Sequence, residues 1–301
     1  MNDLLRLTTL PSDERACEAL ATPRYELLPL ADLQQAADAL PAGAVVTVTC
    51  SPRHGLERTL AASETLAAAG FRVVPHLAAR LVRDRGHLAE AVARLTSLGI
   101  DECFVVGGDA EAAVGDFATG LALLEALVEM PTRPSRVGIP AYPEGHPHIP
   151  ARHLQQDLEA KVWLADYVVT QLCFEAAPLL AWRECQRQRG MSLPIHVGLP
   201  GVLSRKRLLG LATRLGLGAS TRVLGRQKGL VARLLRPARY RPDALLEALW
   251  PWLGDVADGF AGVHLYTFNQ AADTRAWCEA QCRQRATWAG DYESNVERRQ
   301  N

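Results

Sequence analysis

The sequence has no excess of charge of either sign. Its 301 residues include 33 lysine and arginine side chains and 33 aspartate and glutamate side chains, so the formal net charge is zero. Binding to nucleic acids or to anionic membranes depends on clustered positive charge, which this balance does not provide. We therefore expect small molecules as partners, and no nucleic acid.

Long apolar runs are also missing. A helix that crosses a bilayer needs roughly 20 consecutive apolar residues, and no run in the chain approaches that length. The first residues, Met1 to Arg6, lack the charged segment and apolar core of a secretory signal. These absences predict a cytoplasmic protein with no membrane partner.

The seven cysteines form no C-x-x-C pair. An odd number without such pairing is not the pattern of a disulfide framework or of a zinc ribbon. Several cysteines lie inside apolar runs, such as residues 102–106, which indicates reduced and mostly buried thiols. His146 and His148 flank a proline and have no third ligand at helical spacing, so we expect no metal site.

Short β-rich runs alternate with longer segments of helical period along almost the whole chain. The predicted strands cover residues 24–28, 44–50, 71–77, 102–106, 136–141, 167–171, 194–198 and 262–267. The predicted helices cover residues 30–40, 56–69, 84–98, 117–130, 154–164, 176–189, 204–215, 227–235, 242–253 and 270–285. Crossovers of this length force neighbouring strands to be parallel.

Eight strand-then-helix units predict a single closed (β/α)8 TIM barrel, of class α/β. The alternative, a doubly wound sheet, would require a glycine-rich phosphate turn after the first strand, and residues 26–29 contain no glycine. We expect an N-terminal extension at 1–22 and the barrel domain at 23–288. A polar, aperiodic tail at 289–301 is expected to be disordered.

Polar side chains stand at nearly every predicted strand end. In a (β/α)8 barrel the carboxyl ends of the strands meet at one mouth, where the chemistry takes place. These side chains therefore predict a ligand site at that mouth. They are Glu26, Thr49, His76, Asp109, Tyr142, Glu144, Gln171, Tyr266 and Asn269.

Three of these residues allow both a functional and a structural interpretation, and for a fourth, Gln171, function is favoured. Glu26 lies in an apolar strand, where desolvation favours the protonated form of a general acid, or it pairs with an arginine at the barrel base. His76 contacts a phosphate or ring, or is a satisfied core histidine. Asp109 follows two glycines that let a ligand approach the backbone, or it caps the next helix. Gln171 can both donate and accept, which suits the amide edge of a pterin or flavin.

Lys161 is unusual in composition. It is one of only three lysines in an arginine-rich chain. A single lysine normally lies on a solvated helix surface, and that interpretation stays open for Lys161.

The strand-end segments have a recognisable order. The most specific are Tyr-Pro-Glu-Gly-His-Pro at 142–147 and Thr-Gln-Leu-x-Phe at 170–174. The others lie at 24–29, 48–49, 75–77, 108–109, 157–162 and 264–269. Together they resemble the methylenetetrahydrofolate reductase family, from about residue 24 to residue 282.

The resemblance implies a flavoprotein of one-carbon metabolism. NADH or NADPH would reduce FAD, and the reduced flavin would pass hydride to 5,10-methylenetetrahydrofolate to give 5-methyltetrahydrofolate. The implied partners are the folate substrate and the nicotinamide, with a homo-oligomer as a further expectation.

The resemblance also assigns roles to residues. Glu26 matches the acid that opens the methylene bridge, and Asp109 matches the carboxylate that holds the pterin and tunes the flavin. Gln171 and Tyr266, with Asp109, match substrate-binding positions. The positions that match the FAD lining are Thr49, His76, Tyr142, Asp157 and Lys161.

The departures from the family pattern concentrate on the flavin side. Gly107 stands where the family has an arginine for the flavin diphosphate, and loss of such a contact typically costs ~1.5–3 kcal/mol unless Arg53 or Arg80 compensates. Two alternatives therefore stay open. One is a flavin-independent tetrahydrofolate-binding enzyme of demethylation or of formaldehyde or methyl transfer, and the other is a non-catalytic folate-binding subunit. The segment Gly216 to Arg241 has no assigned role.

Overall fold

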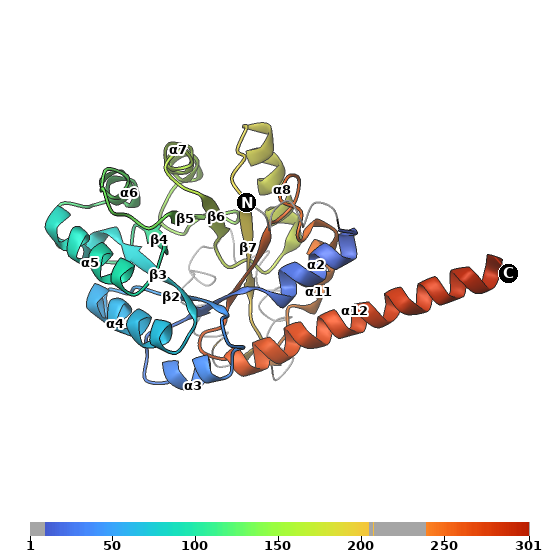
Figure 1. Ribbon diagram of the computed structural model, residues 1–301. Coiled ribbons are helices and arrows are strands. Elements are labelled where there is room, and N and C mark those ends of the chain that lie inside the picture. The colour runs from blue at the N-terminus through green and yellow to red at the C-terminus, as the bar shows by residue number, and fades with distance from the viewer. Residues whose placement is uncertain (1–9, 205–206, 208–238, 301) are drawn as a thin grey trace.

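The computed structural model describes residues 10–204, 207 and 239–300, with the backbone alone for residues 286–300. Eight parallel strands close into a barrel in the order β1-β10-β7-β6-β5-β4-β3-β2, surrounded by helices (Figure 1). The strands are β1 Arg24–Leu27, β2 Val45–Val48, β3 Arg72–Ala78, β4 Glu102–Val106, β5 Arg136–Ala141, β6 Tyr167–Thr170, β7 Ile195–Pro200 and β10 Gly262–Tyr266. This architecture confirms the predicted (β/α)8 TIM barrel.

Helix α2 precedes β1, and each of the other helices follows a strand in chain order. The helices are α2 Ser12–Ala21, α3 Leu33–Asp38, α4 Gly55–Ala68, α5 Arg85–Ser97, α6 Gly120–Val128, α7 Ala151–Lys161, α8 Ala176–Gln188, α11 Asp243–Leu249 and α12 Ala271–Gln300. Short 3-10 turns η1 Ala79–Leu81 and η2 Trp250–Trp252 follow β3 and α11, and β8 Leu203–Ser204 pairs antiparallel with β9 Arg239–Tyr240. The predicted helix at 227–235 and nearly all of the one at 204–215 lie outside the described residues, as does most of the segment at 216–241.

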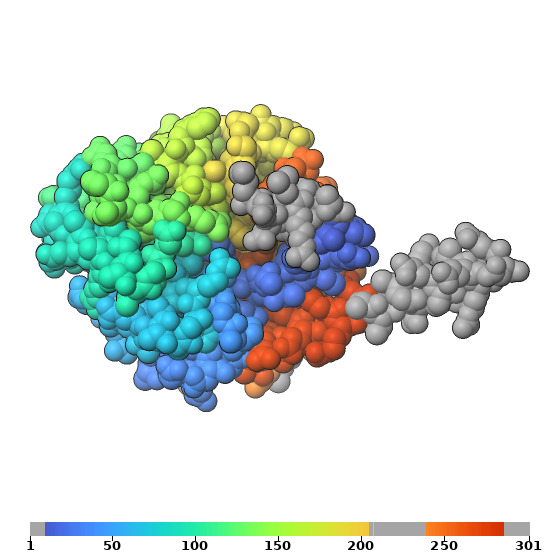
Figure 2. Space-filling model, in the orientation of Figure 1, coloured from blue at the N-terminus to red at the C-terminus, as the bar shows by residue number. Residues whose placement is uncertain are grey.

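The main core lies between the barrel and its helices. Alternate strand residues such as Leu27, Leu77 and Val105 point outward and are fully buried under the helical layer. Figure 2 shows α4 and α5 side by side on the surface, where Arg94 of α5 binds Glu57 and Glu64 of α4. This covered outer face fixes which side chains point into the barrel.

The N-terminal end of the barrel interior is closed by charged and aromatic side chains that begin their strands. Arg24 donates to Glu102 at 2.5 Å, and Arg136 lies 3.6 Å from the other oxygen of Glu102. Both guanidinium groups stack on Tyr167, at 4.5 and 5.3 Å from the ring centroid. The base of the barrel is therefore an ion-paired plug, and the opposite end is left for a ligand.

Helix α2, near the start of the described chain, packs against the barrel and against helix α12. The segment predicted as an N-terminal extension contains α2, whose Ala16 and Leu20 are fully buried and whose Asp13 accepts from the indole of Trp250 at 2.8 Å. Helix α2 also contacts α12, so it belongs to the barrel body.

Helix α12 extends beyond the barrel to Gln300, where the sequence predicted a disordered tail from residue 289 (Figure 1). That prediction relied on the absence of apolar periodicity in this polar run, and the disorder of the tail stays a prediction.

All seven cysteines are free in the structure. Three are buried, three are half-buried, and Cys185 is exposed. Among the described helices, none is both long and apolar enough to cross a membrane.

Candidate active site

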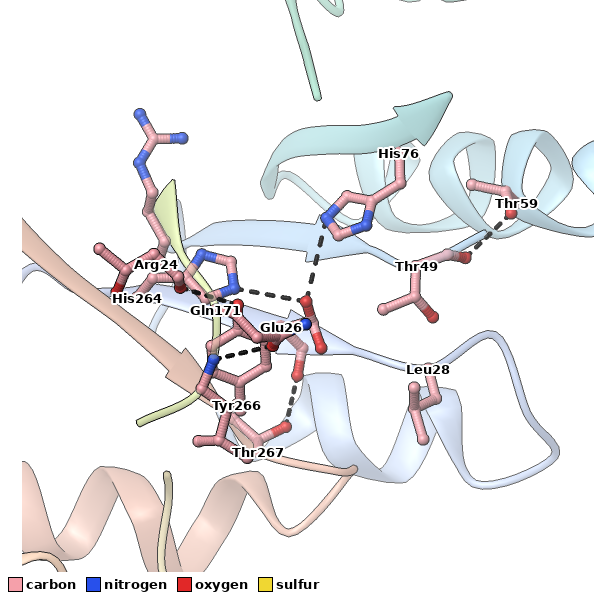
Figure 3. Close-up of polar contacts among 12 residues, drawn as sticks. Arg24, Glu26, Leu28, Thr49, Thr59, His76, Gln171, His264, Tyr266 and Thr267 are labelled. Carbon is pink, nitrogen blue, oxygen red and sulfur yellow. Dashed lines mark hydrogen bonds and ion pairs between the residues drawn. The ribbon is translucent and has the colours of Figure 1, made fainter. Parts of the chain in front are cut away.

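Glu26 points into the barrel near its mouth. Arg24 and Glu26 alternate with Tyr25 and Leu27 along β1, so the two charged side chains share the inner face. Glu26 is 9% exposed, and its backbone carbonyl accepts from the Thr267 hydroxyl at 2.6 Å (Figure 3). At the barrel base, the carboxylate that pairs with an arginine is Glu102. Glu26 is therefore not the arginine-paired carboxylate that was the structural alternative.

Two imidazoles flank the Glu26 carboxyl group. Nε2 of His264 lies 3.4 Å and Nε2 of His76 lies 4.0 Å from the same oxygen, Oε2 (Figure 3). Burial lowers the pKa of His76 to about 4, so this ring is neutral at pH 7. Nε2 of His76 is buried and has no hydrogen-bond partner among the described residues.

Sequence analysis did not select His264 as a site residue. The signal was present in β10, because His264 and Tyr266 alternate and share a face. In the register of β1 and β10, Arg24 pairs with His264 and Glu26 with Tyr266. This pairing between distant segments is what brings His264 to Glu26.

Tyr266 and Gln171 border the same part of the barrel (Figure 3). The Tyr266 hydroxyl donates to the Thr170 carbonyl at 3.0 Å, and burial raises the pKa of this phenol well above its usual value. Gln171 accepts the Leu172 amide through Oε1 at 2.7 Å. The carboxamide nitrogen of Gln171 is then the group that can donate to a ligand, while Tyr266 offers its ring.

A second group of predicted residues gathers at the ends of β4 and β5. Burial raises the pKa of Tyr142 to about 12, and the nearby charges of Asp109 and Asp157 add to the effect. Asp109 is exposed after Gly108, which has a φ of 88°, and helix α6 is capped by Thr119 instead. Asp109 is therefore available to a ligand, and the helix-cap alternative is wrong.

Lys161 is buried, with 4% of its surface exposed, and forms an ion pair with Asp157. This burial excludes the solvated-surface interpretation. A side-chain carbon at Gly120 would lie 3.2 Å from Lys161 Nζ and 3.2 Å from the Gly107 nitrogen, so these groups converge where α6 begins. A lysine beside a helix N-terminus is a favourable environment for a phosphate.

Arg80 adds a second cation near Gly107. Its backbone nitrogen donates to the Gly107 carbonyl at 3.1 Å. Its guanidinium group donates to the carbonyls of Ala110 and Ala118 at 2.8 and 3.1 Å. Arg80 and Arg53 were the two arginines considered as compensation for Gly107. Arg80 contacts the loop that contains Gly107, whereas Arg53 is exposed after β2.

Three further strand-end residues stabilise the rim. The Thr49 carbonyl accepts from the Thr59 hydroxyl at 2.9 Å, which links β2 to α4. Asn269, in the left-handed region at φ 63°, exchanges two hydrogen bonds with the backbone of Leu28 and so joins β10 to β1. Burial raises the pKa of Glu144 to about 7, while backbone hydrogen bonds from the start of α8 oppose the shift.

A family model described as methylenetetrahydrofolate reductase matches residues 24–218, well over half of the 301 residues. The chain belongs to the methylenetetrahydrofolate reductase family. The match includes β1 to β7 and ends before β10, so His264 and Tyr266 enter the site through the closure of the barrel. Family membership supports an oxidoreductase of the methylenetetrahydrofolate reductase type.

The residues at the mouth can be tested for their fit to FAD. Lys161, Arg80 and the start of α6 supply cationic and donor groups for a diphosphate, and a side-chain carbon at Gly107 would lie 3.9 Å from the backbone nitrogen of Gly120. Ala141, which precedes Tyr142, pairs with Thr170, which precedes Gln171, so the two residue groups border one mouth. The donor set fits a phosphate-bearing cofactor at the mouth that Glu26 borders.

Proposed function

We propose that the protein reduces 5,10-methylenetetrahydrofolate to 5-methyltetrahydrofolate, with FAD as cofactor and NADH or NADPH as the source of hydride. The observation that carries this proposal is the carboxyl group of Glu26. It is 9% exposed, lies inside the barrel of a methylenetetrahydrofolate reductase family member, and is flanked by two imidazoles.

Glu26 acts as the general acid. It gives a proton to the nitrogen that leaves as the methylene bridge opens, and an iminium cation forms on the substrate. A proton donor at this point typically contributes ~100- to 10,000-fold to the rate. The Glu26 carboxylate left after proton transfer is negative and therefore stabilises the cation that the transfer creates.

Asp109 and Gln171 orient the pterin. A pterin edge presents both donors and acceptors, which the exposed Asp109 carboxylate and the Gln171 carboxamide nitrogen can pair. The Tyr266 ring supplies an apolar surface, since its hydroxyl is already bonded to Thr170. These contacts place the methylene bridge relative to Glu26.

Lys161, Asp157, Tyr142, Thr49 and His76 would hold FAD. Lys161 and the start of α6 would neutralise its phosphates, while Tyr142 and His76 would line its binding site. When bound, FAD supplies a hydride acceptor for the nicotinamide and a hydride donor for the folate. The protein supplies position, charge and exclusion of water.

The flavin-independent one-carbon enzyme is the second candidate function. Gly107 favours it, because this position carries no cation of its own. The non-catalytic folate-binding subunit remains an outcome of the same test.

The visible absorption spectrum of the purified protein, recorded after FAD addition and gel filtration, separates these candidates. The proposal predicts retained flavin bands that bleach with NADH or NADPH and recover with methylenetetrahydrofolate. A colourless protein that still binds tetrahydrofolate would exclude the flavin mechanism. Turnover would then identify the one-carbon enzyme, and tight folate binding without turnover the subunit.

A further inference from the structure

Both histidines beside Glu26 approach a single oxygen. His264 and His76 lie 3.4 and 4.0 Å from Oε2, and Figure 3 draws both dashed lines to that atom. A distance of 4.0 Å is too long for a hydrogen bond, whereas 3.4 Å lies within the range that tightens when a substrate closes the site. His264 is therefore the one imidazole that can hold Oε2.

The burial of the His264 ring fixes the position of its proton. His264 is 2% exposed, and Nδ1 is buried with no hydrogen-bond partner among the described residues. A proton on Nδ1 would be a buried N–H without an acceptor and would leave a bare Nε2 facing Oε2 of Glu26, whereas a proton on Nε2 has that oxygen as its acceptor. When the ring carries a single proton, that proton thus lies on Nε2, the nitrogen that faces Glu26.

The neighbouring strand gives Nδ1 no acceptor to change this assignment. In the register of β7 and β10, His264 lies opposite Gly198, which has no side chain. His196 precedes Gly198 by two residues on β7 and lies opposite Gly262. Its own Nδ1 is also buried without a hydrogen-bond partner among the described residues. A side-chain carbon at Gly262 would lie 2.7 Å from His196 Nδ1, so the ring of His196 is held over that glycine.

We propose that His264 is the positioning residue of the acid, and that its Nε2–H donates to Oε2 of Glu26. This inference rests on the proposed function. The N–H on Oε2 keeps the acidic proton off that oxygen, so the proton lies on Oε1, the oxygen left for the substrate. The same N–H stabilises the carboxylate that remains after Oε1 has given its proton.

Two substitutions separate a donor from a mere space-filling ring. His264→Gln keeps an N–H donor of similar reach and is expected to keep kcat within about threefold of the wild type. His264→Leu keeps the bulk and loses the donor, so kcat is expected to fall on the order of 10- to 100-fold while the folate Kd stays the same. The control is His87→Leu, which removes a buried imidazole from α5 and should leave kcat unchanged.

A readout without folate makes failure of the inference distinct from failure of the proposed function. The infrared band of the Glu26 carboxyl group, assigned with Glu26→Gln, is compared in the wild type and the three histidine variants. It should shift in His264→Leu and stay in place in His264→Gln and His87→Leu. An unshifted band in His264→Leu, or equal kcat losses in the two His264 variants, would overturn the inference. If the band shifts in His264→Leu but the wild-type protein reduces no folate, the proposed function is wrong and the hydrogen bond is established.

Discussion

At the residue scale, Glu26 has a neighbourhood that its own strand does not reveal. Its place in an apolar strand left two interpretations open, a general acid or a carboxylate paired with an arginine at the barrel base. His264, 238 positions away in sequence, could not be linked to it without the register of β10 on β1. The sequence was therefore enough to select Glu26 as a candidate, and its pairing with His264 was not predictable.

Glu26→Gln removes the acidic proton and keeps the shape of the side chain. We expect kcat to fall by more than tenfold, and by up to ~10,000-fold, because proton transfer to the leaving nitrogen is lost. The folate Kd should stay nearly constant, which equilibrium titration can measure. The control is Glu129→Gln, at an exposed pair with Arg85. Unchanged turnover would remove Glu26 from the acid role.

Lys161→Met keeps the buried stem and removes the cation. Loss of a charge-assisted phosphate contact costs about 1.5–3 kcal/mol, so the FAD Kd should rise on the order of 10- to 100-fold. Quenching of flavin fluorescence measures this Kd. Arg85→Met, at an exposed arginine, is the control and should bind FAD like the wild type. Equal affinities of Lys161→Met and the wild type would place the phosphates elsewhere.

At the element scale, strand positions were predicted more accurately than helix ends. The predictions for β4 and β5 match the structure residue for residue, because apolar runs between turn residues define buried strands. Helix α7 was predicted at 154–164 and lies at Ala151–Lys161. The apolar residues after Lys161 were read as helix, but Trp163 is 86% exposed in the turn before β6.

The ion-paired plug at the barrel base yields a prediction about stability. Glu102→Leu leaves the buried Arg24 without its carboxylate partner, which typically costs about 3–5 kcal/mol. Urea denaturation should show that the free energy of unfolding falls by about this amount. Glu129→Leu, at an exposed ion pair, should change the free energy of unfolding by less than about 0.5 kcal/mol. Similar losses in the two variants would contradict the structural role of Glu102.

At the scale of the whole molecule, the buried histidines make stability depend on pH. Burial lowers the pKa of His76 to about 4 and that of His196 well below its usual value. Between pH ~6.5 and ~4 the unfolded chain binds protons that the folded rings refuse, so folding stability falls as the pH falls. His76 alone would lower the free energy of unfolding by about 3 kcal/mol between these two pH values.

Urea midpoints at pH 7.5, 6 and 5 test this dependence. His76→Gln should lose less stability than the wild type as the pH falls, because the titrating ring is gone. His54→Gln, at an exposed position before α4, serves as the control and should follow the wild type. Parallel losses in wild type and His76→Gln would show that His76 does not carry the effect.

The most direct test of the central claim is the formation of 5-methyltetrahydrofolate. The wild-type protein is incubated with methylenetetrahydrofolate and NADH or NADPH, with and without added FAD, and the product is quantified by chromatography. The account predicts product with at least one nicotinamide when FAD is present, and at least tenfold less in Glu26→Gln. Absence of product from an FAD-loaded wild type, or equal amounts from wild type and Glu26→Gln, would contradict it.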